Sequence, residues 1–394
     1  MQRRTFIHTL AMLPLAARMG GLWAAPATKS KLLVVFLRGG YDAANLLVPI
    51  SSPFYYESRP NIAVPRPGAD LNTALPLNAD WGLHPALRES IYPLYQNGQA
   101  AFIPFAGTED MTRSHFETQD GIELGQPLTG TRNYASGFLN RLAATLNGAA
   151  AIAFTDQLPI ILQGSAQVPN SALRSLAKPA LDQRQSDIIA AMYKGSALAQ
   201  QVNEGFSVRK ELAQELAGEM QAASRDAITA KGFELEARRI ARLMKEKYSI
   251  GFVDVGGWDT HVGQGNGTGY LAGRFDELGR GLAAFSQEMG GDWKDTVVVV
   301  ISEFGRTFKE NGNRGTDHGH GTAYWVLGGS VHGGQVLGEQ VKVDRASLNQ
   351  NRDFPVLNEY RAVFGGLFAR MYGLNAAQVE RIFSGVKARD IGLV

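Results

Sequence analysis

Apolar and polar residues alternate along the chain in blocks that predict strands and helices in turn. Several apolar runs are nearly continuous, which is typical of strands buried on both faces of a parallel sheet. The predicted strands are 31–37, 100–105, 151–154, 160–162, 250–255, 296–301 and 324–327.

Helical patterns lie between these runs. Residues 84–95 have helical character, and apolar residues recur at helical spacing over 275–289. A long stretch of about 181–247 is rich in Ala, Glu, Gln, Arg and Leu and predicts a helical insertion. Strands that alternate with helices predict an α/β fold, in which a mostly parallel central sheet is flanked by helices. We find no repeat or linker, so 28–394 is expected to form one domain.

The first 27 residues are expected to be a signal peptide. Arg3 and Arg4 precede a short, weakly apolar run, and a small-residue stretch then offers cleavage after Ala25 or Ala27. Paired arginines favour the twin-arginine route, with the translocase as partner, and a periplasmic or secreted protein. The apolar run is shorter than the roughly 20 residues that span a bilayer, so no stable membrane insertion is expected. A basic N-terminus on a buried helix is the alternative.

Charge and cysteine content narrow the function classes. The chain has 39 basic and 37 acidic residues, and three of the arginines would leave with the signal peptide. The remaining near-neutral chain has no basic run, so a nucleic-acid partner is not expected. The absence of cysteine excludes disulfides, thiolate catalysis and Cys-ligated zinc.

Candidate metal ligands follow the predicted strands. Asp259 and His261 stand in a Gly-rich motif after 250–255, and carboxylate plus imidazole suits Zn²⁺, Mn²⁺ or Fe. Glu303 follows 296–301, and Asp42 follows 31–37. In parallel α/β folds the carboxyl ends of the strands meet at one edge, where ligands bind. The alternatives are helix caps for the two aspartates and a structural ion pair for the glutamate, with Arg306.

The densest polar motif is 315–322, in which Asp317, His318 and His320 alternate with glycines. Core packing does not require such a string, so it predicts metal ligands, with an exposed polar loop as the alternative. Ser114 precedes His115 at a predicted helix start, where free N–H groups favour a developing anion and a nucleophile. A simple Ser N-cap, with Glu117 completing a capping box, is the simpler interpretation from the residues alone.

Five motifs together resemble the domain-of-unknown-function 1501 family, over the chain from about Lys31 to the C-terminus. The motifs are FLRGGYD at 36–42, RSHF at 113–116, GWDTH at 257–261, SEFGR at 302–306 and TDHG at 316–319. The family commonly carries twin-arginine signals and is similar to the alkaline phosphatase/sulfatase superfamily. The resemblance therefore implies an alkaline-phosphatase-like three-layer sandwich that binds a divalent metal (Zn, Mn or Ca).

The motifs and the resemblance together predict roles for individual residues. Asp42, Asp259, His261, Glu303, Asp317, His318 and His320 would be metal ligands, Ser114 and Arg306 would be catalytic, and Arg38, Arg113 and His115 would bind substrate. The superfamily spaces its Asp/His pair more widely than Asp259 and His261. It also has Asp-His where this chain has Glu303-Phe304, so a two-metal ligand set is one histidine short.

The motifs thus predict an exported metal-dependent hydrolase, and the resemblance implies that it acts on phosphate or sulfate esters, of an anionic small molecule or a glycan. The alternative is a non-catalytic binding or assembly protein that keeps the fold and a structural metal. A third interpretation, carboxylic ester hydrolysis, requires a histidine that acts as base on Ser114.

Overall fold

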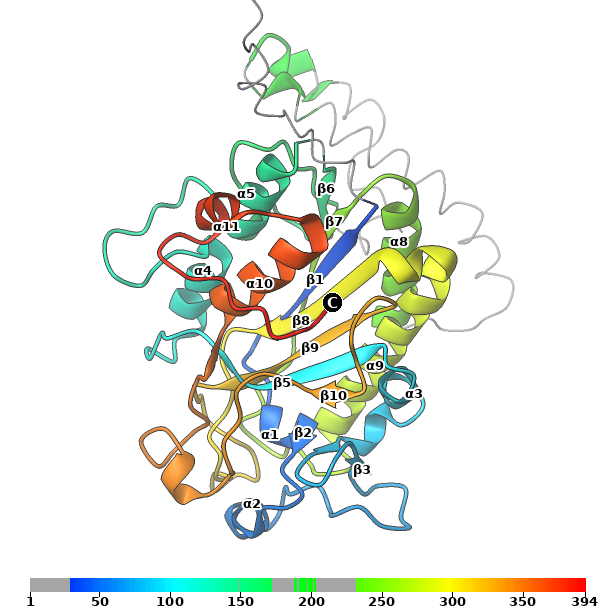
Figure 1. Ribbon diagram of the computed structural model, residues 1–394, viewed down its shortest axis with the longest axis vertical. Coiled ribbons are helices and arrows are strands. Elements are labelled where there is room, and N and C mark those ends of the chain that lie inside the picture. The colour runs from blue at the N-terminus through cyan, green and yellow to red at the C-terminus, as the bar shows by residue number, and fades with distance from the viewer. Residues whose placement is uncertain are drawn as a thin grey trace, which may run out of the picture.

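In the part of the chain that the structure describes, eight strands form one central sheet, in the order β10-β5-β9-β8-β1-β7-β6, with β11 paired to β5 (Figure 1). Their bounds are β1 Lys31–Leu37, β5 Ala100–Gly107, β6 Ala151–Ala153, β7 Ile250–Val255, β8 Thr296–Ser302, β9 Thr322–Gly328, β10 Gln335–Val336 and β11 Asn358–Glu359. β9 is antiparallel to its neighbours β5 and β8, and the other pairings are parallel. The expected mostly parallel sheet is confirmed.

The computed structural model describes residues 29–147, 149–171, 188–189, 191–196, 198–200, 202 and 232–394. The expected signal peptide lies outside the described residues, as does most of the expected insertion at 181–247. The end of that segment forms α8, Phe233–Glu246, which packs against α9, Tyr270–Met289, on one face of the sheet.

Helices cover both faces of the sheet. The side chains of β1 alternate between two cores, with Leu33 and Val35 on the side of α8 and α9, and Leu32 and Val34 on the other. The second core lies under α5, α10 and α11, of which α10 lies in front of the sheet in Figure 1. The remaining bounds are α1 Ala43–Leu46, α2 Pro53–Ser58, α3 Ile91–Gln96, α4 His115–Leu124, α5 Phe138–Thr145, α10 Tyr360–Tyr372 and α11 Ala376–Ile382.

Two predicted elements differ from the structure. Residues 160–162 form a 3₁₀ helix, so their assignment as a strand was wrong. The Ile161 N–H donates to the Glu123 carboxylate (3.1 Å), so a side chain takes the place of a neighbouring strand. The helix expected at 84–95 is divided into the 3₁₀ turn Pro85–Leu87 and α3.

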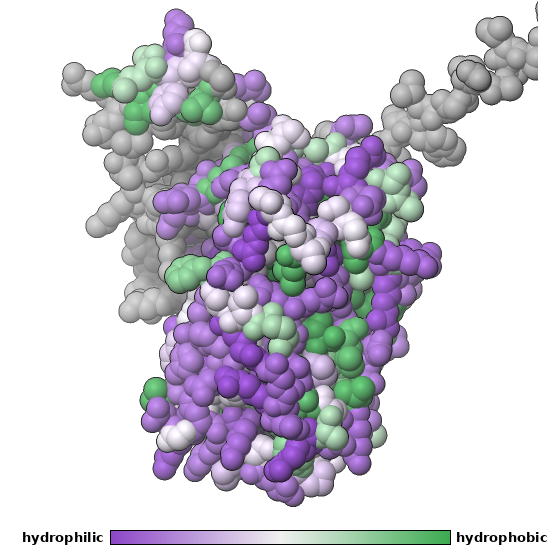
Figure 2. Space-filling view, turned by 90° about the vertical axis from the view of Figure 1, so that its left-hand side faces the viewer, coloured by the Kyte–Doolittle hydropathy of each residue, from purple (hydrophilic) through white to green (hydrophobic). Residues whose placement is uncertain are grey.

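A small antiparallel sheet lies beside α1. It consists of β2 Leu47–Val48, β3 Leu75–Pro76 and β4 Gly82–Leu83, in the order β2-β4-β3. The face in Figure 2 is mostly hydrophilic, with apolar residues in scattered patches. Within the described ranges, no helix combines the length and hydropathy that crossing a bilayer requires.

Candidate metal centre

Three adjacent parallel strands end at the same edge of the sheet. In their register, Leu37 at the end of β1 lies opposite Val255 of β7 and Ser302 of β8. The loops that follow therefore start side by side, and they bring Asp259 and Glu303 to one place. This is the edge at which α/β sheets bind ligands.

Gly39 lets two of these loops approach each other. Its φ is +125°, and a Cβ added there would lie 2.7 Å from the backbone nitrogen of Asp259, so no other residue fits without displacement. Its own N–H donates to the Glu303 Oε1 (2.8 Å). The glycine thus ties the first loop to the other two.

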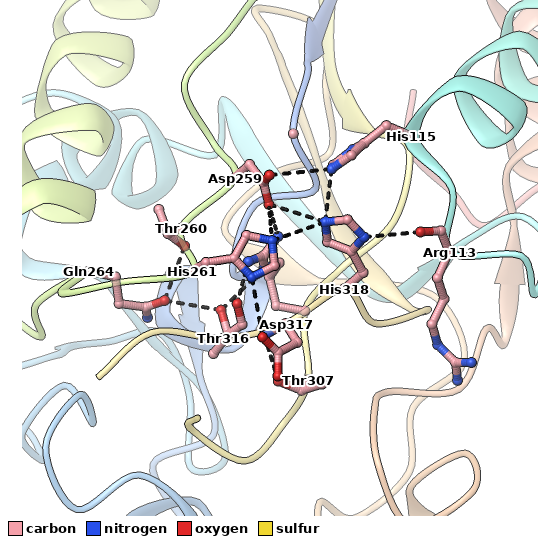
Figure 3. Close-up of polar contacts among 12 residues, drawn as sticks. Arg113, His115, Asp259, Thr260, His261, Gln264, Thr307, Thr316, Asp317 and His318 are labelled. Atoms are coloured by element: carbon pink, nitrogen blue, oxygen red, sulfur yellow. Dashed lines mark hydrogen bonds and ion pairs between the residues drawn. The ribbon is translucent and has the colours of Figure 1, made fainter. Parts of the chain in front are cut away.

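Imidazole and carboxylate atoms meet beyond these loops (Figure 3). Ligand atoms of His115, Asp259 and His318 all lie within 4.8 Å of one another. The Nε2 of His318 is 2.9 Å from His115 Nε2 and 3.3 Å from Asp259 Oδ1, and His115 Nε2 is 3.6 Å from Asp259 Oδ2. Two ligands about 2.0–2.1 Å from one tetrahedral ion lie about 3.3–3.4 Å apart, so the spacing fits a single cation.

His261 is the fourth candidate ligand. Its Nε2 is 2.9 Å from Asp259 Oδ1 and 3.2 Å from His318 Nε2, although it is not part of the compact three-residue group. It therefore borders the cation position on the side of Asp259 and His318.

The Nδ1 atoms of His261 and His318 each face a hydrogen-bond acceptor on the side of the ring opposite the cluster. The Asp317 carboxylate lies 3.2 Å from the Nδ1 of His261, and the Arg113 carbonyl oxygen lies 3.1 Å from the Nδ1 of His318. Arg113 has a φ of 54°, a strained value for a residue with a side chain, and strain of this kind is concentrated at functional sites. Acceptors behind the ring fix the tautomer and aim Nε2 at the cluster.

The third ring, His115, is held by a buried carboxylate. Glu303 has no exposed side-chain surface, and its Oε1 accepts hydrogen bonds of 2.8 Å from His115 Nδ1, Gln119 Nε2 and the Gly39 N–H. Burial raises the pKa of Glu303, but these donors outweigh it and hold that pKa below its usual value. The hydrogen bond between Glu303 and His115 also raises the pKa of His115.

The donor chemistry fits a metal ion. With Nδ1 bonded to an acceptor, each ring in its neutral form presents the lone pair of Nε2 to the other rings and to the Asp259 carboxylate. Lone pairs repel unless a proton or a cation lies between them. Nitrogen ligands with one carboxylate oxygen suit Zn²⁺ or Mn²⁺ better than Ca²⁺, which prefers an all-oxygen set.

Arg306 stands behind Asp259. Its guanidinium, with no exposed side-chain surface, contacts the Asp259 carboxylate and the Thr316 carbonyl and hydroxyl oxygens. Burial raises the pKa of Asp259, but the Arg306 contact outweighs it and lowers that pKa. Arg306 therefore keeps Asp259 ionised.

The expected substrate-binding arginines are engaged by the protein. The guanidinium of Arg38 donates to Asp254 (2.7 Å), Gln119 (2.8 Å) and Glu123 (2.8 Å). That of Arg113 donates to Asp353 and Gln350. Arg38 thus braces Gln119, which in turn holds Glu303.

Asp42 and His320 do not join the cluster. Asp42 is buried, bonded to both terminal nitrogens of Arg59 and to Gln264 Nε2 (2.6 Å). Its carboxylate is thus taken up by Arg59 and Gln264, and it makes no side-chain helix cap. His320 is directed to the backbone of Asp110, and burial lowers its pKa.

Ser114 is the N-cap of α4 and precedes the candidate ligand His115, but its side chain makes no capping hydrogen bond. Both nitrogens of His115 are directed elsewhere, Nδ1 to Glu303 and Nε2 to the cluster. No Ser–His base pair therefore forms between these neighbours, which counts against the carboxylic ester interpretation.

Comparison with known proteins places the chain in a family. The model of the family described as "Protein of unknown function (DUF1501)" matches residues 29–383. The chain belongs to the DUF1501 family. No curated protein matches it.

Solved structures resemble this DUF1501 member only weakly, with low sequence identity and low TM-scores. A protein in the alkaline phosphatase superfamily from Vibrio parahaemolyticus is 13% identical, with a TM-score of 0.37, over 89% of this chain and 71% of that one. The protein Ps i-CgsB is 11% identical, with a TM-score of 0.36, and its complex with k-i-k-neocarrahexaose is 9% identical, with a TM-score of 0.34. For both, the shares covered are 89% and 73%. At such scores the likeness decides nothing about activity.

Sequence interpretation missed two residues that shape this DUF1501 site. Gln119 lies four residues after His115 on α4, so helical spacing places both on one face, and that spacing was the available signal. Arg59, the partner of Asp42, lies just after α2, and no motif or spacing marks it.

Proposed function

We propose that this DUF1501 protein is an exported metal-dependent hydrolase of phosphate or sulfate esters. The observation that carries the proposal is the convergence of His115, Asp259, His261 and His318, three rings with their Nδ1 atoms held and their Nε2 atoms directed inward. A divalent ion there supplies Lewis acidity toward an ester oxygen.

Exposure of the cluster supports a catalytic role over a structural one. The side chains of Asp259 and His261 are 42% and 41% exposed. Structural zinc sites are closed by protein ligands, whereas catalytic sites keep a position open to water or substrate. A substrate could therefore reach this cation from solvent.

The ester class and the nucleophile rest on the resemblance to the alkaline phosphatase/sulfatase superfamily. We assign Ser114 as the nucleophile because it begins α4 beside His115 and its hydroxyl makes no capping hydrogen bond. Its oxygen would form the bond to phosphorus or sulfur as the bond to the ester oxygen breaks, and its proton would pass to the departing alcohol. Water would then cleave the serine ester and complete the hydrolysis. The free N–H groups at the helix start favour the developing negative charge. The substrate would be an anionic small molecule or a glycan ester.

One observation favours a non-catalytic alternative, a binding or assembly protein that keeps the metal. The guanidinium groups of Arg38, Arg113 and Arg306 are all bonded to carboxylates of the protein itself. They therefore position other residues, and none is left free to hold the anionic group of a substrate.

Metal analysis and an ester panel test the proposal. The purified protein should contain metal, and His318→Ala should lose it, whereas the exposed His332→Ala should keep it. At a metal level several hundred times the dissociation constant, bound metal stabilises the fold by roughly 3–4 kcal/mol, so a chelator should lower the Tm of the wild type but not of His318→Ala. Ser114→Ala should keep the metal and lose hydrolysis of phosphate or sulfate esters. If no metal copurifies and chelation changes nothing, the hydrolase is refuted. A metal-loaded protein inert toward every ester supports the binding protein.

A further inference from the structure

A second cavity lies beside the candidate metal centre. It has a volume of about 530 Å³ and lies between α2, the 307–311 segment and the 345–352 segment. Its aromatic side is Phe54, whose ring stacks on the buried Phe308 at 5.1 Å. The volume is in the range of small-molecule sites.

Two residues connect this cavity to the cation position. Asp317 lines it and also contacts the candidate ligand His261. Arg352 lines it and donates a hydrogen bond of 3.1 Å to the carbonyl oxygen of His318. The cavity therefore lies next to two candidate ligands, on the side of the His261 Nδ1 and the His318 backbone.

The basic side chains of the cavity form fewer hydrogen bonds and ion pairs within the protein than its acidic side chains do. Lys309, Arg345 and Arg352 line it, and in the described part of the chain neither Lys309 nor Arg345 forms an ion pair. The guanidinium of Arg345 instead lies 5.9 Å from the ring centre of Phe54.

Two of the three lining carboxylates already have hydrogen-bond donors. Glu310 accepts from the backbone N–H groups of Asn61 and Ile62 and from the Asn61 side chain, and Asp317 accepts from Asn311. The exposed Glu57 is the remaining acid. Among the described residues, the cavity thus offers two cationic groups without an ion pair, Lys309 and Arg345, against one carboxylate without a hydrogen-bond donor, Glu57.

We propose that this cavity binds a second anionic group of the substrate, so that the natural substrates are esters with at least two anionic groups. The inference rests on the proposed function for the identity of the first group, which would bind at the cation. Lys309 and Arg345 would hold the second group, and the organic part between them would pack against Phe54.

Calorimetric titration of the full protein, with metal and after chelation, tests the inference. The probes are fructose 1,6-bisphosphate and inorganic phosphate. Arg345→Ala and Lys309→Ala should each weaken bisphosphate binding roughly fivefold, the effect of losing one exposed ion pair, and leave phosphate binding to the metal-loaded protein unchanged. Arg280→Ala, which removes an exposed arginine of α9, is the matched control and should change neither.

The results can refute the second anion site without refuting the proposed hydrolase, and the reverse. If both variants bind bisphosphate as the wild type does, or lose phosphate binding to the same extent, the inference is overturned whatever the protein hydrolyses. If bisphosphate binding still depends on Arg345 in the chelated protein, the cavity is supported even where no ester is hydrolysed.

Discussion

The substitution Asp42→Asn tests whether the first strand ends in a structural ion pair or in a metal ligand. Asp42 and Arg59 have 1% and 0% exposed side-chain surface. Arg59 also donates to the carbonyl oxygens of Phe308 (2.6 Å) and Thr307 (3.0 Å), so its guanidinium cannot turn to solvent. The amide conserves shape but leaves this buried cation without a counter-charge. Breaking such a pair costs about 3–5 kcal/mol.

Urea unfolding, followed by circular dichroism in the presence of a chelator, measures this cost without any contribution from metal. Asp276→Asn is the control, because its carboxylate pairs with Arg280 on the surface of α9 and should contribute at most about 1 kcal/mol. A double variant, Asp42→Leu with Arg59→Met, should recover part of the loss, because it removes both charges together.

Metal content of the same variant decides the role of Asp42. We expect Asp42→Asn to bind as much metal as the wild type, since the carboxylate is directed at Arg59 and Gln264. A variant that unfolds like the control but has lost its metal would refute the structural assignment and restore Asp42 as a ligand.

Three further predictions concern the hydrogen bonds that orient His115, the stability of the fold in acid, and export. Gln119→Ala should weaken metal affinity roughly tenfold, because it frees the carboxylate that orients His115, and unchanged affinity in a metal titration would contradict this. The buried His84 has a pKa lowered to about 4 by burial, so the unfolded chain takes up the proton first. The free energy of unfolding should therefore be unaffected by His84 above pH 6.5 and should fall by roughly 3 kcal/mol as the pH falls toward 4. Urea unfolding of the wild type and of His84→Gln across this pH range would measure the loss. Changing Arg3 and Arg4 to Lys should leave the precursor folded in the cytoplasm, as cell fractionation would show, and normal export would contradict the twin-arginine assignment.

Much of the fold was predictable because its strands are buried on both faces. Such strands are runs of apolar residues, and the bounds of β7 agree with the predicted 250–255. The run at 160–162 has the same character, but it is short and its backbone N–H is taken by a carboxylate far away in the chain. Local pattern carries no information about such a long-range partner, nor about the antiparallel direction of β9.

The cluster was predictable only as a set of residue types. Asp259, His261 and His318 were expected as ligands and contribute atoms to the cluster, while His115 was expected to bind substrate. Sequence shows which side chains can bind metal but not which ring nitrogen is already bonded. Glu303 accepts a hydrogen bond from the Nδ1 of His115. This contact depends on how the two side chains are oriented, and that orientation cannot be deduced from the sequence.

The position of β1 has a consequence for how the chain reaches its native state. β1 is the first strand to be synthesised, yet its partners on the two sides, β7 and β8, begin only at Ile250 and Thr296. An apolar strand with two open edges invites pairing with other chains, and folds dominated by such distant contacts form slowly. Assembly of the sheet centre must therefore wait until most of the polypeptide has left the ribosome. During that interval the apolar residues of β1 lack the two strands that cover its edges in the native sheet, which makes this stage the one most open to aggregation.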